Sequence, residues 1–286
     1  MKPSIVKDRN KANNKPTPQE TIEPEEKNTM NSSADALQRY FLELSYDGTD
    51  FFGWQKQPKD ISVQEVIETQ LSKLHSNRPV SVVGCGRTDT GVHAYHYILH
   101  VDIPHVDDLD KFQFKLNRML PDSIAIQDVY PVSDDWHARF SASSRTYRYF
   151  IHQKKDPFET RHSLYFPQKL NVKAMNEAAQ LLLGTQDFTS LSKLHTDVKT
   201  NICTVTEAKW YSDNTPLFFE IRADRFLRNM VRATVGTLLE VGLGKVQPHE
   251  VKDILEAKDR GAAATSVPPQ GLFLWKIEYN GLQKSK

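Results

Sequence analysis

The order of the regular elements predicted by hydrophobic periodicity is the strongest constraint on how this chain folds. In the first half, the predicted elements are a strand at 40–46, a helix from residue 62, strands at 80–83 and 95–101, a helix at 109–120 and a strand at 124–132. Ser62 and Glu65 have the spacing of a capping box, and Pro121 ends the second helix. The order β-α-β-β-α-β is that of a ferredoxin-like domain with an antiparallel sheet.

The second half of the chain shows a similar order less regularly. Its predicted elements are a strand at 146–152, a helix at 172–183, strands at 205–211 and 217–223, helices at 226–241 and 249–257, and a last strand at 272–279. We therefore expect an α+β protein with two ferredoxin-like domains, residues 37–143 and 144–282, each with its own antiparallel sheet. If the two sheets face each other, the surface between them forms a cleft.

The amino-terminal segment differs in composition from the rest. Residues 1–35 are rich in Lys, Glu, Asn, Pro and Thr, and their positive and negative charges are equal in number. Such a segment cannot bury enough apolar surface to offset its chain entropy, so we interpret residues 1–36 as a disordered polar tail. Its balanced charge makes it a weak candidate for binding nucleic acid, and we assign it no role.

The composition favours a cytoplasmic location. No apolar run is long enough to cross a bilayer, and the amino terminus is polar, so we expect neither a membrane anchor nor a signal peptide. The two cysteines, Cys85 and Cys203, lie far apart and match no metal-ligand spacing, which favours a reducing compartment.

A glycine-rich loop after the strand at 80–83 carries the first candidate for chemistry. Gly84, Gly86 and Gly91 allow a sharp turn and a close approach to a ligand. Asp89 lies among them, and a single carboxylate at the end of a strand is a candidate nucleophile. Arg87 would keep Asp89 ionised, because an opposite charge within a few ångströms favours the charged form.

Two stretches are strongly basic, although the formal net charge of the chain is only +1. Residues 139–155 contain five basic residues and no acid, and residues 222–232 contain four arginines and one acid. Local basic patches suit a protein that binds a nucleic acid and then releases it. Solvated arginines without a partner are the simpler interpretation, and charge alone does not decide between the two.

The first basic stretch includes a candidate platform for an RNA base. On a strand at 146–152, Tyr147 and Tyr149 share one face and Arg148 points to the other. A tyrosine on a sheet beside arginines can stack on an unstacked base. The simpler alternative is a pair of half-buried tyrosines that only pack within the sheet.

The second basic stretch includes the predicted helix at 226–241. On that helix, Arg225, Arg228 and Arg232 would share one face, from which a guanidinium can reach a phosphate or a carboxylate. An ordinary amphipathic helix would show the same pattern.

Two other kinds of site compete with an RNA site. His93, His96 and His100 follow Asp89, but in a strand His93 faces away from the other two, so convergence on a metal ion fails and we expect no metal. A glycosidase normally needs two facing carboxylates, and this loop supplies one.

Several blocks together resemble the tRNA pseudouridine synthase A family. The glycine-rich loop continues as Gly86-Arg87-Thr88-Asp89-Thr90-Gly91-Val92-His93-Ala94, which is similar to the signature of that family. Further similar blocks are 46–48, 52–55, 62–64, 137–142, 147–149, 182–184, 187–189, 230–232, 235–236 and 271–274. They occur in the order of the family, from about residue 38 to about residue 280. One departure is Thr90, where alanine is usual.

The resemblance implies an isomerase that converts uridine to pseudouridine in RNA without a cofactor. Asp89 matches the essential aspartate of the family and would be the nucleophile, at C1′ or C6, or would promote a glycal route. Arg232 matches the arginine that pairs with that aspartate. Tyr147 matches the tyrosine that stacks on the target base, and Arg87 would hold the target nucleotide outside the RNA helix.

The resemblance also implies the substrate and the assembly. The expected substrate is the anticodon stem-loop of tRNA, at positions 38, 39 and 40, and the expected assembly is a cytoplasmic homodimer. The implied fold is two ferredoxin-like domains that flank a basic, RNA-binding catalytic cleft. An RNA-binding module on the same fold that lacks catalysis is the alternative from a different class.

Overall fold

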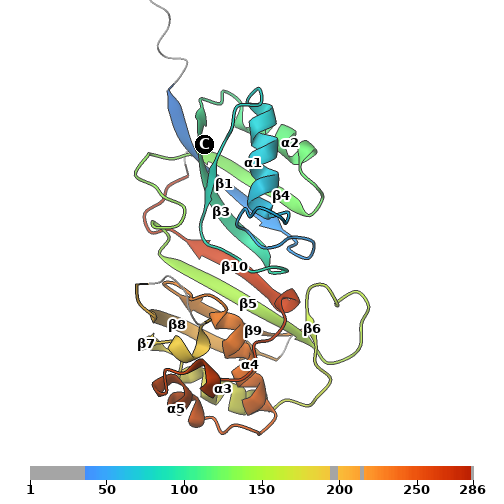
Figure 1. Ribbon diagram of the computed structural model, residues 1–286, viewed down its shortest axis with the longest axis vertical. Coiled ribbons are helices and arrows are strands. Elements are labelled where there is room, and N and C mark those ends of the chain that lie inside the picture. The colour runs from blue at the N-terminus through green and yellow to red at the C-terminus, as the bar shows by residue number, and fades with distance from the viewer. Residues whose placement is uncertain (1–35, 194–198, 213–215, 285–286) are drawn as a thin grey trace, which may run out of the picture. The chain divides into compact units, whose positions relative to one another are not determined.

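The computed structural model describes residues 36–193, 199–212 and 216–284. Our interpretation of the tail therefore lies outside the described residues, except for residue 36. Within the described part, the chain has a mixed α/β fold with ten strands and five α-helices (Figure 1). None of these helices combines the length and the hydrophobicity that crossing a membrane requires.

The elements of the described part have the following bounds. The strands are β1 (Leu37–Tyr46), β2 (Val82–Gly84), β3 (His93–Pro104), β4 (Ile124–Pro131), β5 (Ser144–His152), β6 (Leu164–Tyr165), β7 (Gly184–Asp187), β8 (Ile202–Tyr211), β9 (Leu217–Ala223) and β10 (Leu272–Glu278). The helices are α1 (Val63–Leu74), α2 (Leu109–Met119), α3 (Val172–Gln180), α4 (Met230–Gly242) and α5 (Glu250–Glu256). Short 3-10 helices are η1 (Thr189–Leu191), η2 (Arg260–Ala262) and η3 (Pro269–Gly271).

Local chemistry explains why the predicted helices begin where they do. The Ser62 side chain accepts a hydrogen bond from the Glu65 amide at 3.2 Å, so the predicted cap of α1 is confirmed. Asp108 caps α2 in the same way through the Lys111 amide, at 2.8 Å. Strands β6 and β7 have two and four residues, which is too short to give a periodic pattern, and the sequence did not predict them.

The first half of the chain contributes four strands to the sheet, and the second half contributes six, four of which are arranged like those of the first half. In the first half, β1 pairs antiparallel with both β3 and β4, and β2 pairs with the far edge of β3. In the second half, β5 pairs antiparallel with both β9 and β10, and β8 pairs with β9. The two halves therefore repeat one strand order, β4-β1-β3-β2 and β10-β5-β9-β8.

The strands of both halves belong to one ten-stranded sheet, which differs from the two sheets we expected. The link is a short parallel pairing of β10 with β3, Phe273 opposite His93 and Leu274 opposite Ala94. It forms because β2 covers β3 only at residues 99–101. The first residues of β3 thus keep free backbone groups at that edge, and β10 satisfies them.

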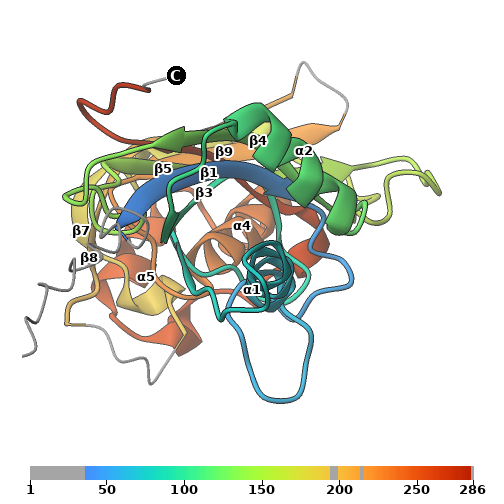
Figure 2. The ribbon, with the colours of Figure 1, turned by 90° about the horizontal axis from the view of Figure 1, so that it is seen from above.

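The hydrophobic core consists of two clusters, and the first of them has buried side chains on both faces of the sheet, since the neighbouring residues Phe41 and Leu42 are both fully buried. One cluster joins β1, β3 and β4 to α1 and α2, and the other joins β5, β8 and β9 to α3 and α4. Figure 2 shows α1 and α4 on the same side of the sheet, and the carboxyl-terminal segment on the other. Tyr147 in β5 packs against both clusters, so it lies where the two halves meet.

Gly236 allows the segment before β10 to pack closely on α4. A Cβ atom at this position would lie 2.0 Å from the Thr265 carbonyl oxygen. Alanine normally stabilises a helix relative to glycine, but here the clash outweighs that gain. We predict that Gly236→Ala lowers the free energy of unfolding by about 1–3 kcal/mol, measured by urea denaturation.

The matched control is Gly86→Ala, since a Cβ atom at residue 86 would meet nothing within 4 Å. If both variants unfold at the same urea concentration as the wild type, the close approach at α4 does not constrain the fold.

Candidate active site

Hydrogen bonds on both sides of Asp89 hold the loop between β2 and β3 in place. The Thr88 carbonyl accepts from the Trp54 amide at 3.2 Å, and the Gly91 amide donates to the Phe51 carbonyl at 3.2 Å. The buried Thr88 hydroxyl bonds the Tyr46 hydroxyl at 2.9 Å. Gly91 has a φ of 73°, which favours glycine. The loop therefore presents Asp89 from a fixed backbone.

Two arginines face the Asp89 carboxylate. Arg232 Nη1 lies 3.5 Å from Oδ2, and Arg228 Nε lies 3.8 Å from Oδ1. The Arg232 side chain is 20% exposed and the Arg228 side chain 60%, against 29% for Asp89. Because Arg232 is the more buried of the two, solvent screens its charge less, and it is the main electrostatic partner of Asp89.

Arg232 is fixed by the segment that leads into β10. Its Nε donates to the Val267 carbonyl at 2.7 Å, while the Val267 amide donates to the Arg232 carbonyl at 3.1 Å. With Nε occupied, the guanidinium offers Nη1 to Asp89. The structure brings Arg232 to Asp89, the residue with which the resemblance pairs it.

The prediction that three arginines share one face of a helix at 226–241 is wrong. Helix α4 begins at Met230, after Asn229 in a left-handed conformation with φ 66°. Arg225 and Arg228 therefore precede the helix, and only Arg232 lies on it. Apolar periodicity did not reveal this start, since Leu227 is buried at 5% exposure although it lies outside the helix.

Tyr147 lies on β5 close to the loop. Its ring packs edge-on against Phe226, with 5.0 Å between centroids. Burial raises the pKa of the Tyr147 hydroxyl, and the Asp89 charge raises it further. The hydroxyl is therefore protonated at neutral pH. The neighbouring Tyr149 is fully buried and donates to the Pro268 carbonyl at 2.8 Å, so it has a packing role.

Arg87 does not take the place expected for it beside Asp89. Its side chain is exposed, and within the described residues it makes no ion pair. The cations at Asp89 are instead Arg228 and Arg232, which are distant in sequence.

Much of the first basic stretch is engaged inside the protein. The Arg145 guanidinium donates to four backbone carbonyls, those of Cys85, Arg139, Ala142 and Asp224. Arg148 pairs with Glu220 and lies over the Trp275 ring, 4.0 Å from its centroid. The basic side chains of this stretch that stay exposed to solvent are Arg139, Lys154 and Lys155.

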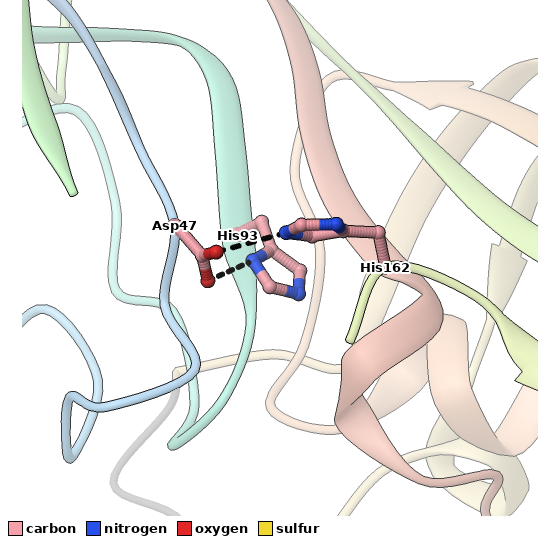
Figure 3. Close-up of side chains that lie close together, drawn as sticks. All are labelled: Asp47, His93 and His162. Atoms are coloured by element: carbon pink, nitrogen blue, oxygen red, sulfur yellow. Dashed lines mark hydrogen bonds and ion pairs between the residues drawn. The ribbon is translucent and has the colours of Figure 1, made fainter. Parts of the chain in front are cut away.

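The three histidines that follow Asp89 lie in separate environments. The His96 ring accepts from the Ile277 amide at 3.2 Å, and the His100 ring accepts from the Ala138 amide at 3.1 Å. His93 lies instead with Asp47 and His162 (Figure 3). The sequence did not single out this Asp47–His93–His162 cluster, because His162 follows a different strand.

Comparison with known proteins identifies the family of this chain. A sequence model of the family described as tRNA pseudouridine synthase matches residues 44–141 and 178–280. The chain belongs to this family.

Similar proteins include three that carry the name tRNA pseudouridine synthase A. The one from Parabacteroides distasonis is 50% identical over 244 residues, which cover 85% of this chain and 96% of the relative. The one from Bacteroides thetaiotaomicron is 49% identical over 246 residues, 85% of this chain and 91% of the relative. The one from Bacillus subtilis is 42% identical over 240 residues, 83% of this chain and 97% of the relative.

The matched ranges contain Arg87, Asp89 and Arg232, whereas Tyr147 lies between them. Its candidacy rests on the Tyr147-Arg148-Tyr149 block and on its place beside the Asp89 loop.

The Asp47–His93–His162 cluster could hold a metal ion by the spacing of its donor atoms, which all lie within 4.8 Å of one another. The hydrogen bonds of His93 favour a different interpretation. Its Nδ1 accepts from the Gly48 amide at 3.0 Å, and its Nε2 lies 3.1 Å from the Arg161 carbonyl and 3.2 Å from that of Gln270. Both ring nitrogens are thus engaged, with the proton on Nε2.

The charge state of the cluster follows from its contacts. Burial lowers the pKa of His93, so the ring is neutral. Burial pushes the pKa of Asp47 up, but hydrogen bonds from Thr49 and His162 outweigh it and lower that pKa to about 2. His162 Nε2 lies 2.8 Å from Asp47 Oδ2. We interpret the cluster as a hydrogen-bonded network that joins β1, β3 and the segment before β6.

This network predicts a pH-dependent contribution to stability. The folded pKa of Asp47, about 2, lies below the ordinary value of 3.8, so its contribution is full above that value and disappears as the pH falls towards 2. We predict that Asp47→Asn lowers the free energy of unfolding at pH 7 by about 1 kcal/mol, discounted for partial solvent exposure.

Urea denaturation at a series of pH values from neutral to acid measures the effect, with exposed Asp135→Asn as the control. A difference between Asp47→Asn and wild type that stays constant down to acid pH would contradict this charge state.

Proposed function

We propose that this protein converts uridine to pseudouridine in tRNA. The observation that carries the proposal is the placement of Asp89, whose part-exposed carboxylate lies between Arg228 and Arg232 on a pinned loop. In this isomerisation the N1–C1′ bond breaks and a C5–C1′ bond forms, while C5 loses a proton and N1 gains one. There is no net oxidation or reduction, so a carboxylate and correct positioning can suffice without a cofactor or a metal.

Each site residue has a proposed role that follows from its surroundings. Asp89 is the nucleophile, and attack at C1′, attack at C6 and a glycal route all start from this carboxylate. Arg232 orients it and stabilises its charge. The ring of Tyr147 stacks on the target base, and its protonated hydroxyl can bond a base or ribose oxygen. Arg87, which is exposed, holds a phosphate of the extruded nucleotide.

The proposed substrate is the anticodon stem-loop of tRNA, with targets at positions 38, 39 and 40. Exposed cations at Arg87, Arg139, Lys154 and Lys155 support a surface that reads the RNA backbone. We propose the cytoplasm as the location, since tRNA is used there and since the buried Cys85 and Cys203 are free thiols.

The proposed fold is two ferredoxin-like domains, 37–143 and 144–282, that flank a basic cleft. The repeated strand order, β4-β1-β3-β2 and β10-β5-β9-β8, supports it. Further support comes from the two hydrophobic clusters, because each half has a core of its own.

We propose a homodimer formed through the face of the sheet that lies opposite α4. Phe150 follows the buried Tyr149 in β5 and so points to that face, where its ring lies 5.5 Å from Phe218 and 5.8 Å from Trp275. Trp275 stacks on Tyr95, which is 61% exposed, beside a hollow of about 540 Å³. A second copy of this sheet would cover these aromatic rings.

The role of Asp89 can be tested by removing its carboxylate. We predict that Asp89→Ala lowers the rate of pseudouridine formation by ~10³-fold or more, because it removes the catalytic nucleophile. Binding of tRNA should remain, since a carboxylate repels phosphates. Mass spectrometry of nucleosides and a filter-binding assay measure the two effects.

Exposed Asp135→Ala is the matched control. Substantial turnover by Asp89→Ala would overturn the assignment, and tRNA binding without turnover by the wild type would favour a non-catalytic RNA-binding module.

A further inference from the structure

The loop between β5 and β6, residues 153–163, projects from the sheet as an arm (Figures 1 and 2). Near its tip, Phe158 is 89% exposed, the highest value among the large hydrophobic side chains of the described residues. Among the other exposed rings, Tyr95 stacks on Trp275 and Phe140 lies under Arg139, whereas Phe52 and Phe114 also have no such partner within the described residues. Within the described part of the chain, Phe158 has no aromatic or cationic partner.

The tip of the arm has a defined hydrogen-bonded structure. The Phe158 amide donates to Asp156 Oδ1 at 2.9 Å, the Thr160 hydroxyl donates to the Pro157 carbonyl at 3.2 Å, and the His162 amide donates to the Glu159 carbonyl at 3.1 Å. These bonds order the loop around Phe158, whose ring is exposed to water and therefore contributes no hydrophobic burial to the stability of the fold. An ordered loop that exposes an aromatic ring in this way indicates a surface that contacts a partner.

The base of the arm is anchored next to the Asp89 loop by the Asp47–His93–His162 cluster (Figure 3). His162 bonds Asp47, and the Arg161 carbonyl accepts from His93 Nε2. His93 is four residues from Asp89, so their Cα atoms lie within about 14 Å even if the chain between them is fully extended. A substrate bound at Asp89 therefore has its neighbouring nucleotides within reach of the arm.

The charges on the arm select the kind of partner. Lys154, Lys155 and Arg161 are exposed, and none of their side chains makes an ion pair within the described residues. Of the two acids on the arm, the Asp156 carboxylate is engaged in capping the tip, whereas Glu159 makes no ion pair within the described residues, so the exposed cations still outnumber the free carboxylate. An aromatic ring among free cations matches the combination of a base and its phosphates.

We propose that the 153–163 arm is a second tRNA-binding site, in which Phe158 stacks on a base outside the target nucleotide and Lys154, Lys155 and Arg161 contact the adjoining phosphates. The proposal rests on the tRNA substrate proposed above, and it deepens that function by adding a contact remote from the reacting base. The arm contributes affinity, and the reaction of the bound uridine does not depend on it.

The test compares Phe158→Ala, Phe158→Trp and a control, Phe114→Ala, which removes a ring that is 67% exposed on α2. Binding of a full-length tRNA transcript is measured by fluorescence anisotropy, and the rate of pseudouridine formation by single turnover at saturating enzyme. Phe158→Ala should raise Kd about 5- to 150-fold, the range for loss of one base–aromatic stack, and leave the saturated rate unchanged. Phe158→Trp and Phe114→Ala should bind like the wild type.

Two outcomes overturn the proposal. One is an unchanged Kd for Phe158→Ala. The other is a shift of Phe158→Ala to a smaller species in sedimentation velocity without RNA, which would mean that the ring contacts a second copy of the chain. If the wild type formed no pseudouridine, the proposed function would fail, whereas the comparison of Kd values would still decide the role of the arm.

Discussion

The parallel pairing of β10 with β3 is the interaction on which the candidate site depends. It joins two residues of each strand, Phe273 with His93 and Leu274 with Ala94. His93 and Ala94 lie directly after the Asp89 loop. The segment that leads into β10 carries Val267, which holds Arg232 on α4. The pairing therefore brings the carboxylate of one half of the chain against the arginine of the other.

The looseness of the arginine contacts suits a carboxylate that reacts. Separations of 3.5 and 3.8 Å are longer than a charge-assisted hydrogen bond of about 2.7–2.9 Å. A tight bidentate pair would occupy the lone pairs of Asp89 and lower its nucleophilicity. Here Arg232 gives its Nε to a backbone carbonyl and keeps a positive charge near the carboxylate, so a lone pair stays free for the substrate.

Local patterns predicted the local structure well. The cap at Ser62 and the stop at Pro121 each depend on neighbouring residues, and the structure agrees with both. The start of α4 could not be predicted in this way, because buried Leu227 continues the apolar pattern outside the helix. The short pairing of β10 with β3 has no sequence signal, since it depends on an edge that β2 leaves uncovered.

The site likewise combines residues that a local motif reveals with contacts that depend on the fold. Asp89, Arg232 and Tyr147 came from motifs, and the structure brings Arg232 to Asp89 and places Tyr147 close to the loop. The pairing of Arg228 with Asp89 was missed because only Arg232 matched the arginine that the family pairs with its aspartate. The sequence also gave no sign that Arg145 binds backbone carbonyls and that Arg148 pairs with Glu220. His162 was missed because it contacts Asp47 across 115 positions of sequence.

Tritium release from tRNA transcript labelled with [5-³H]uridine, with the wild-type protein in EDTA, tests the central claim most directly. The account predicts release, because C5 loses its hydrogen when the C5–C1′ bond forms and no metal is needed. An absence of release from every transcript that the protein binds would contradict it.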